Sequence, residues 1–459
     1  MKELEKYTKL FQKDRVNKTN EFLNLISEKE IKYSNRLSSK EKCELYGIKV
    51  KSLENLFNAY YMKETKLCGG NDKEVHINDK VFPILKKKDM TNWVCFYEKN
   101  NYNDAEFFFN YLAKASKVFG LKIEEPEWVE LGNHSSIIDW TATANDYFGK
   151  NKSDYNFAVF LLGRNDKIYT QLKRHSLCNN GYVSQVVKVK TLYKKTMSVF
   201  SKIILQINTK LGGISYKAIE DRRIKDRKLM IIGVDSSHIK DKRTGVGMVA
   251  TINDSFTNFF NKEELIKEKN NREQLQYCIR SFIETAFEVY KKENKEYPKG
   301  IIIYRQGVSF QQKEYLKTEI PQIHSFCEAK KILYYYILVN IKTNYKFIEK
   351  ANNKFINPDR GLLVVDGVTN KNFFEFYIQP QEVTLGSATP TCFHVAYGNL
   401  DIPELILKLT YDLCYIYSNW NGSISVPNVL KAAGKLAKMV AKYTYSELNK
   451  NLEKGQAYI

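Results

Sequence analysis

Two apolar runs, each followed at once by polar residues, constrain the fold of this chain more than any other feature. The first is KLMIIGVDSSH (Lys228–His238), where Leu229–Gly233 lead into Asp235 and a polar turn, before a second apolar run at Gly247–Ile252. Continuous apolar runs rich in Ile and Val are typical of buried strands. A carboxylate at the end of such a strand is poorly solvated, so it indicates a divalent metal, a hydrogen-bond network or an Asp that caps the turn.

A second stretch, GIIIYRQGVS (Gly300–Ser309), repeats the apolar strand with a polar exit. Between the two stretches, Lys262–Asn294 carries apolar side chains at helical spacing and predicts a long helix. Two strands with a long helix between them are typical of a ribonuclease H-like fold, in which carboxylates from separate strands meet at a two-metal site. Here the second exit carries Gln306 where a metal-binding Asp would be needed.

The residues upstream alternate between strand and helix patterns. This alternation predicts a parallel, doubly wound, Rossmann-like layer. The predicted strands are Trp93–Glu98, Phe157–Gly163 and Gln185–Leu192, and the predicted helices are Ala105–Gly120, ended by its glycine, and Lys194–Lys210. Downstream, we expect strands at Ile332–Ile341, Gly361–Gly367 and Phe373–Ile378, and a Lys- and Ala-rich helix over Pro427–Leu452.

The net charge of +20 and the pI of about 9.3 favour a polyanionic partner, most simply nucleic acid. A lysine-rich proteome with AT-rich coding bias explains the charge equally well. The charged N-terminus has no apolar segment typical of a secretory signal, and no apolar run approaches the length of a membrane span. We therefore expect an intracellular protein, cytoplasmic or nuclear, with no membrane partner.

Six segments in fixed order resemble the MID and PIWI half of Piwi-clade Argonaute proteins. They are IYTQLKRHSLCNNGYVSQVV (Ile168–Val187), IILQINTKLGG (Ile203–Gly213), IIGVDSSH, IIIYRQGVS, GSATPTCFHVAYGN (Gly386–Asn399) and LTYDLCYIYSNWNGSISVP (Leu409–Pro427). The resemblance implies a helical linker-like region at 1–91, a Rossmann-like MID domain at 92–214 and a ribonuclease H-like PIWI domain at 215–459. Because only about 90 residues precede the MID-like layer, it also implies that no PAZ domain is present, unless a partner chain supplies that function.

The resemblance also implies a pocket for the 5′ phosphate of a guide RNA. Its residue types fall on Tyr169, Lys173, Gln185 and Lys210, with Gln206 where the Argonaute clade proper has a lysine. An aromatic ring to stack on, cations for the phosphate and polar donors are what a 5′-terminal nucleotide requires. A Gln at position 206 leaves room for a Mg²⁺ ion beside the phosphate, although no cofactor is required. The alternative is a surface helix whose lysines are merely solvated.

The family's nuclease uses an Asp–Glu–Asp–His set of metal ligands, and these positions fall on Asp235, Glu273, Gln306 and Gly434. For Glu273 we favour the other interpretation, a solvated glutamate at a helix start. Gln is a weak Mg²⁺ ligand and Gly offers no side chain, so two of the four ligands are lost and we predict no target cleavage. Asp366 is a candidate substitute, but it follows a strand where the family places no ligand.

Two functions therefore compete. The first is a guide-binding protein that does not cleave, which would pair its small RNA with complementary target nucleic acid and recruit silencing effectors. The second is an RNA-independent scaffold or regulatory partner of silencing proteins. The presence together of four pocket residues favours the first function, because a scaffold has no need of them: Tyr169, Lys173, Gln185 and Lys210.

Overall fold

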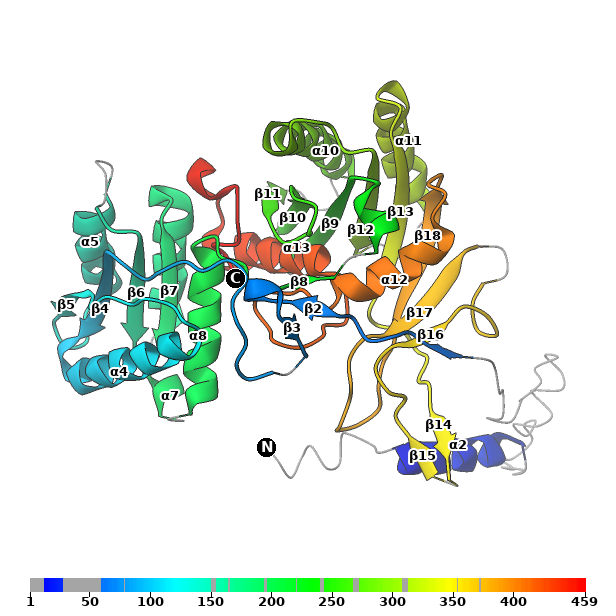
Figure 1. The fold of residues 1–459 in the computed structure, drawn as a ribbon, viewed down its shortest axis with the longest axis horizontal. Coiled ribbons are helices and arrows are strands. Elements are labelled where there is room, and N and C mark those ends of the chain that lie inside the picture. The colour runs from blue at the N-terminus through cyan, green and yellow to red at the C-terminus, as the bar shows by residue number, and fades with distance from the viewer. Residues whose placement is uncertain are drawn as a thin grey trace, which may run out of the picture. The chain divides into compact units, whose positions relative to one another are not determined.

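The computed structural model describes residues 12–27, 59–77, 79–149, 154–163, 166–193, 196–219, 221–239, 243–266, 272–307, 313–352, 354–370 and 373–459. The chain forms two compact units (Figure 1). Unit 1 comprises Met1–Lys63 and Ile341–Phe393, and unit 2 comprises Glu64–Asn340 and His394–Ile459. The five residues of the predicted guide pocket and the four positions matched to the nuclease ligands belong to unit 2, whereas Asp366 belongs to unit 1. The domain boundaries at 91/92 and 214/215 rest on sequence motifs and stay predictions.

Unit 2 contains a four-stranded sheet that is parallel throughout, as the alternation of strands and helices predicts. Its strands, in order across the sheet, are β5 (Glu127–Leu131), β4 (Trp93–Glu98), β6 (Phe157–Leu162) and β7 (Val183–Lys188). One face is covered by α4 (Tyr102–Val118) and α8 (Met197–Lys210), the other by α5 (Ile137–Phe148) and α6 (Asp166–Arg174). Gly120 follows α4 with φ of 64°, a conformation that suits glycine at a helix end.

The predicted strand over Gln185–Leu192 is wrong in its second half. β7 ends at Lys188, and Val189–Leu192 form the short helix α7. Val and Thr favour a strand locally, but tertiary context decides here, because both Val189 and Leu192 are buried in the helical turn.

The larger sheet of unit 2 runs β13-β12-β9-β10-β11, and β18 (Thr391–Gly398) lies beside β13. β12 is parallel to both β9 and β13, whereas β9, β10 and β11 are antiparallel neighbours. Their bounds are β9 (Leu229–Ile239), β10 (Arg243–Thr251), β11 (Phe259–Ile266), β12 (Gly300–Gln306) and β13 (Leu333–Asn340).

Two predictions for this sheet need correction. Asp235 does not end its strand or precede a turn, because β9 continues to Ile239 and pairs Asp235 with Gly247 of β10. The sequence alone predicted a turn after Asp235, but pairing with β10 keeps these polar residues in the strand. The helix predicted from Lys262 begins later, because Phe259–Ile266 are strand β11 and α10 covers Arg272–Asn294.

A glycine face on β9 and β10 positions the helix α13 (Asn428–Met439). This face consists of Gly233, Gly245 and Gly247. A Cβ on Gly245 would lie 2.5 Å from the backbone oxygen of Ala437, and one on Gly233 would lie 2.5 Å from the backbone oxygen of Val429. The glycines therefore let the α13 backbone lie directly on the strands, which fixes where its side chains point.

The opposite face of the larger sheet carries the main core. α10 and α11 (Lys313–Ala329) pack there against the large side chains of β9, β10, β12 and β13. As predicted, α10 contributes Leu275, Ile279, Phe282, Ile283, Ala286, Phe287 and Tyr290 on one face.

The remaining elements of unit 2 are short. A three-stranded antiparallel sheet consists of β3 (Glu74–Val75), β2 (Leu67–Cys68) and β8 (Lys217–Ala218). The helices are α9 (Arg222–Lys225) and α12 (Pro403–Leu413), the 3₁₀ turns η1 (Gly70–Asp72), η2 (Lys99–Asn101) and η5 (Lys450–Leu452), and the π-helical turns η3 (His175–Asn180) and η4 (Val440–Thr444).

In the described part of unit 1, one helix combines with short antiparallel strands. Its elements are α2 (Gln12–Ser27), β1 (Tyr60–Tyr61), β14 (Glu349–Ala351), β15 (Lys354–Ile356), β16 (Leu362–Val364) and β17 (Glu375–Gln379). Gln12 bonds to Asn357, and Arg15 Nε donates to Ser387 Oγ at 2.7 Å, so α2 is held to the later segment of the unit. Part of the helical region predicted for residues 1–91 lies outside the described residues.

Candidate anion-binding pocket

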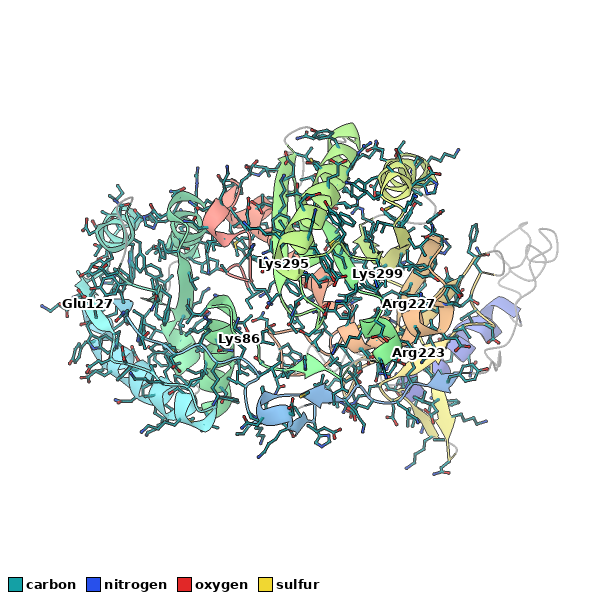
Figure 2. All side chains as sticks on the ribbon, turned by 45° about the horizontal axis from the view of Figure 1, so that its top comes forward. Lys86, Glu127, Arg223, Arg227, Lys295 and Lys299 are labelled. Atoms are coloured by element: carbon teal, nitrogen blue, oxygen red, sulfur yellow. The ribbon has the colours of Figure 1, made fainter. Side chains whose placement is uncertain are left out.

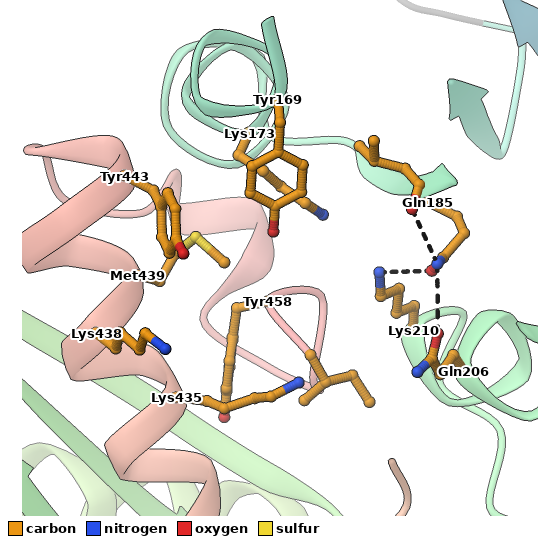
Figure 3. A pocket seen from close by; sticks show the side chains of 12 residues that line it. Tyr169, Lys173, Gln185, Gln206, Lys210, Lys435, Lys438, Met439, Tyr443 and Tyr458 are labelled. Carbon is orange, nitrogen blue, oxygen red and sulfur yellow. Dashed lines mark hydrogen bonds between the residues drawn. The ribbon is translucent and has the colours of Figure 1, made fainter. Parts of the chain in front are cut away.

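Four elements of unit 2 converge on one cavity of about 300 Å³ (Figure 3). It is lined from α6 and β7 by Tyr169, Lys173, Gln185 and Val186, from α8 by Gln206 and Lys210, and from α13 and the C-terminal segment by Lys435, Lys438, Met439, Tyr443, Tyr458 and Ile459. All five residues predicted for a guide-binding pocket therefore lie around this single cavity. The alternative of a solvated lysine face does not describe Lys173 and Lys210, which are 3% and 6% exposed.

Lys173 and Lys210 converge on the backbone of β7. Lys210 Nζ donates to Ser184 O at 3.0 Å and to Gln185 Oε1 at 2.8 Å. Lys173 Nζ donates to the same Ser184 oxygen at 3.3 Å. Helices α6 and α8 thus place two ammonium groups around one carbonyl oxygen. Because an ammonium group has three donors, each lysine keeps the capacity to bind an anion in the cavity.

Keeping several lysines charged in this pocket is electrostatically unfavourable, because the described lining residues include no Asp or Glu side chain. Burial, and then the nearby charge of Lys435, lowers the pKa of Lys173 to about 8. Burial, followed by Lys173 and Lys435, holds the pKa of Lys210 well below its usual value. Burial, with Lys431 and Lys438, lowers the pKa of Lys435 to about 8. A bound anion would relieve this shared repulsion.

We predict that sulfate binds this pocket more weakly as the solution changes from about pH 7 to about pH 9.5. Sulfate stays doubly charged, so the change reports on the lysines. Above the pKa of about 8 of Lys173 and Lys435, binding requires each lysine to regain its proton. Affinity should fall by up to about tenfold per pH unit for each such lysine. The measurement is the sulfate-induced rise in Tm at both pH values, and an unchanged rise would contradict the prediction.

A hydrogen-bond chain leads away from the pocket. Gln185 Nε2 donates to Gln206 Oε1 at 3.3 Å, and Gln206 Nε2 donates to Asn419 Oδ1 at 2.6 Å. With the bond from Lys210, this orients both glutamine side chains (Figure 3). Gln206 therefore acts in the ligand-free structure as a link between β7 and the loop after α12.

The aromatic part of the pocket comes from two helices that each pass into a π-helical turn. Tyr169 lies on α6, before η3, and Tyr443 lies in η4, after α13. Their rings meet edge to face with centroids 5.5 Å apart. π-Helical turns interrupt regular helices and occur frequently at functional sites.

Sequence reasoning missed the contribution of the C-terminal segment. Lys435, Tyr443 and Tyr458 line the pocket, and Asn419 orients Gln206. The available signal was the spacing of Lys431, Lys435 and Lys438, which places cations close together on one helix surface. No local signal marks Tyr458, because only the packing of the whole unit brings it there.

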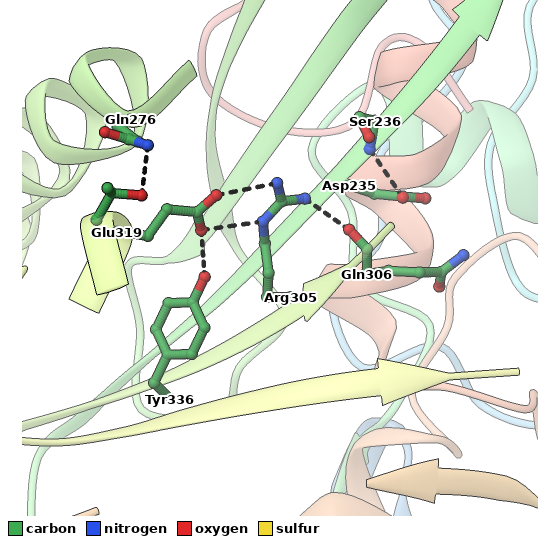
Figure 4. Close-up of polar contacts among 8 residues, drawn as sticks. Asp235, Ser236, Gln276, Arg305, Gln306, Glu319 and Tyr336 are labelled. Carbon is green, nitrogen blue, oxygen red and sulfur yellow. Dashed lines mark hydrogen bonds and ion pairs between the residues drawn. The ribbon is translucent and has the colours of Figure 1, made fainter. Parts of the chain in front are cut away.

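Three of the four positions matched to the nuclease ligands lie close together: Asp235 and Gln306, which Figure 4 shows, and Gly434. Gln306 is one residue beyond the pairing of Arg305 with Val234, which places it beside Asp235. A Cβ on Gly434 would lie 2.6 Å from Asp235 Oδ2, so the carboxylate occupies the space that a side chain at 434 would need. Glu273 lies in the first turn of α10, and its side chain is outside the described residues.

These residues do not fit a two-Mg²⁺ centre. Asp235 supplies one carboxylate, and burial raises its pKa to about 6 against the opposing effects of the Ser236 amide and Arg305. Two Mg²⁺ ions require several oxygen ligands, whereas Gln306 is neutral and Gly434 supplies none. In the part of the chain that the structure describes, no group of three or more His, Cys, Asp or Glu side chains is placed to hold a metal ion.

Basic side chains also lie on the surface of unit 2. Arg223, Arg227, Lys295 and Lys299 lie near the beginnings of β9 and β12 (Figure 2). Acidic neighbours pair with some of the cations there, as in Arg223–Asp221 at 2.7 Å and Lys228–Glu296 at 2.7 Å. Among the described helices, none has the length and apolar character needed to cross a membrane.

The chain matches the Piwi domain over residues 156–445, more than half of its length. It is 27% identical over 405 residues to Protein argonaute-3 of Drosophila melanogaster, which covers 87% of this chain and 45% of that protein. The crystal structure of Drosophila Piwi is 22% identical with a TM-score of 0.83, covering 100% of this chain and 63% of that one. Kluyveromyces polysporus Argonaute with a guide RNA is 16% identical with a TM-score of 0.74, covering 87% and 53%.

These similarities confirm the predicted fold class, which combines a Rossmann-like layer with a ribonuclease H-like sheet. The chain spans about half the length of the curated relatives it matches. The extent of the domain match, together with the Argonaute and Piwi-like relatives, shows that the chain belongs to the Piwi domain family.

Proposed function

We propose that the chain holds the 5′ phosphate of a short single-stranded guide RNA and presents the guide for pairing with complementary nucleic acid in RNA-mediated silencing. The observation that carries the proposal is the convergence of Lys173, Lys210 and Lys435 on one cavity beside Tyr169. Lysines in a cavity with no Asp or Glu side chain among its described lining residues suit a terminal phosphate, which bears more charge than an internal one. The Kluyveromyces polysporus Argonaute structure, which contains a guide RNA, supports the same class of ligand.

Each side chain has a distinct part in this proposal. Lys173 and Lys210 donate charge-assisted hydrogen bonds to phosphate oxygens, and Ser184 O holds their ammonium groups at the cavity wall. Gln185 and Gln206 orient Lys210 through their hydrogen-bond chain. The ring of Tyr169 provides a stacking surface for the first base. Lys435 adds positive charge from α13. The pocket therefore requires both the four-stranded sheet with its helices and the helix that packs on the larger sheet.

A Mg²⁺ ion in this pocket would need the phosphate oxygens as ligands. The oxygen of Gln185 already accepts from Lys210, and that of Gln206 accepts from Gln185. With lysines on several sides and no Asp or Glu side chain among the described lining residues, the protein alone offers a poor cation site. We propose that phosphate binding does not depend on Mg²⁺, and that any ion enters with the guide.

Binding of a short single-stranded RNA with and without a 5′ phosphate, at fixed salt, tests the proposal. We expect the phosphate to strengthen binding on the order of 100-fold, which corresponds to about 3 kcal/mol from two charge-assisted contacts. Lys173→Ala with Lys210→Ala should abolish this preference. The measurement is fluorescence anisotropy of a 3′-labelled RNA titrated with protein.

Lys114→Ala with Lys117→Ala is the matched control. Both lysines are exposed on α4, so the control removes the same charge away from the pocket. It should retain the phosphate preference. Weak binding of wild type that is indifferent to both the phosphate and the pocket variant would instead favour an RNA-independent scaffold.

We further propose that the guide-loaded protein does not cleave its target, because Gln306 and Gly434 replace two metal ligands of the family's nuclease. Incubation with a matched, labelled target and either Mg²⁺ or Mn²⁺ should yield no product at the guided position. Binding of the 5′-phosphorylated guide in the same sample controls for inactive protein. A product that disappears in Asp235→Ala would refute this proposal and point to a substitute ligand.

A further inference from the structure

A second cavity, of about 860 Å³, lies at the carboxyl ends of the four-stranded parallel sheet. Glu98 ends β4, Gly163 follows β6, Lys188 ends β7, and His134 lies in the loop after β5. The cavity therefore touches the exits of all four strands. It shares no lining residue with the anion-binding pocket. We call it the switch-point cavity for its place in the sheet.

The sheet order explains why a crevice forms there. β4 lies between β5 and β6, so the chain passes from β5 across β4 to reach β6. α4 leaves β4 toward one face of the sheet, and α5 leaves β5 toward the other. In open parallel sheets, ligands bind in the crevice outside the carboxyl ends of the strands at such a reversal of strand order.

The side chains that line this cavity are of three kinds: cationic, aromatic and hydrogen-bonding. Lys188 at the end of β7 and Lys190 on α7 bring positive charge, and Tyr193 brings a ring that is 64% exposed. Glu98 at the end of β4 and Asn101 in the following turn η2 bring hydrogen-bonding groups. Gly163 lies next to both groups, because a Cβ there would lie 3.6 Å from Glu98 Oε2 and 3.9 Å from Asn101 Nδ2. Glu98 Oε1 accepts from the Ser135 amide at 3.1 Å, which orients the carboxylate.

We propose that the switch-point cavity binds a nucleoside phosphate. Lys188 and Lys190 bind its phosphate groups, Tyr193 stacks on its base, and Glu98 and Asn101 accept and donate hydrogen bonds to its sugar hydroxyls. The cavity volume is within the range of small-molecule sites. A simple anion would make no use of Glu98 or the tyrosine ring, and a neutral sugar would make no use of the two lysines. The proposal stands independently of guide binding.

Calorimetric titration of the full chain with ADP tests this proposal. We expect Lys188→Ala with Lys190→Ala to weaken ADP binding by at least about tenfold, whereas Lys114→Ala with Lys117→Ala leaves it unchanged. Lys173→Ala with Lys210→Ala should also leave ADP affinity unchanged, because those residues line the other pocket. Retained binding of 5′-phosphorylated RNA by the Lys188 and Lys190 variant would show that it is folded.

A second arm separates the base from the phosphates. Tyr193→Ala should weaken ADP binding on the order of tenfold and leave inorganic pyrophosphate binding unchanged, because only ADP has a base to stack. Three results would overturn the proposal: no ADP binding by wild type, ADP binding that only the Lys173 and Lys210 variant loses, or equal affinities for ADP and pyrophosphate.

Discussion

Lys173→Met should raise the free energy of unfolding of the ligand-free protein by about 2 kcal/mol at neutral pH while abolishing phosphate binding. The lysine is 3% exposed, and its pKa falls from 10.5 to about 8. One pKa unit corresponds to about 1.4 kcal/mol, so keeping this group charged costs the fold roughly 3 kcal/mol. Methionine retains most of the apolar stem, and Lys210 still donates to Ser184 O.

The pH dependence identifies the cause. Between the folded pKa near 8 and the unfolded value of 10.5, the unfolded chain binds more protons at this site than the folded chain. The penalty is therefore fully present below about pH 8 and disappears as the pH rises toward 10.5. Urea denaturation at two pH values should show the advantage of Lys173→Met shrinking. Lys117→Met, at an exposed site, should change stability by less than about 0.5 kcal/mol at either pH.

Glu319→Ala should destabilise the protein by about 3–5 kcal/mol, because it leaves the Arg305 guanidinium buried without its partner charge. Both side chains are 1% exposed, and Arg305 Nε and Nη2 each lie 3.3 Å from a Glu319 oxygen (Figure 4). The Tyr336 hydroxyl donates to the same carboxylate. Removing Glu319 therefore leaves Arg305 with the Gln306 carbonyl oxygen but no carboxylate, and takes the Glu319 acceptor from the Tyr336 hydroxyl. Denaturant unfolding measures the loss.

Two variants make this prediction specific. Glu284→Ala breaks the exposed Arg280–Glu284 pair of α10, at 3.0 Å, and should cost less than about 1 kcal/mol. Arg305→Met with Glu319→Met removes both buried charges and should recover most of the stability lost in Glu319→Ala. If the double variant is as unstable as the single variant, packing rather than the unpaired charge is responsible.

The sequence was most informative where local pattern and fold agree. The alternation from Trp93 to Lys210 predicted a parallel sheet, and the motif positions of Tyr169, Lys173, Gln185, Gln206 and Lys210 predicted side chains that share one cavity. Each of these residues sits on an element whose periodicity is visible in the sequence.

It was least informative where distant segments decide the local structure. The polar residues Asp235–His238 become strand only because β10 pairs with them, and Val189–Leu192 become helical although they include the strand-forming residues Val and Thr. Lys435 reaches the pocket because α13 lies against β9 and β10, an arrangement that no spacing within the tail helix reveals.

The glycine face has a consequence for how inactivating substitutions in this chain should be interpreted in a genetic screen. Gly245 and Gly247 lie far in sequence from every lysine of the pocket, yet any side chain there meets the backbone of the helix that carries Lys435. A variant at either glycine would displace that helix and impair ligand binding without touching a ligand contact. The loss of function in such a variant would therefore reflect a displaced α13, although its phenotype would resemble that of a pocket mutation.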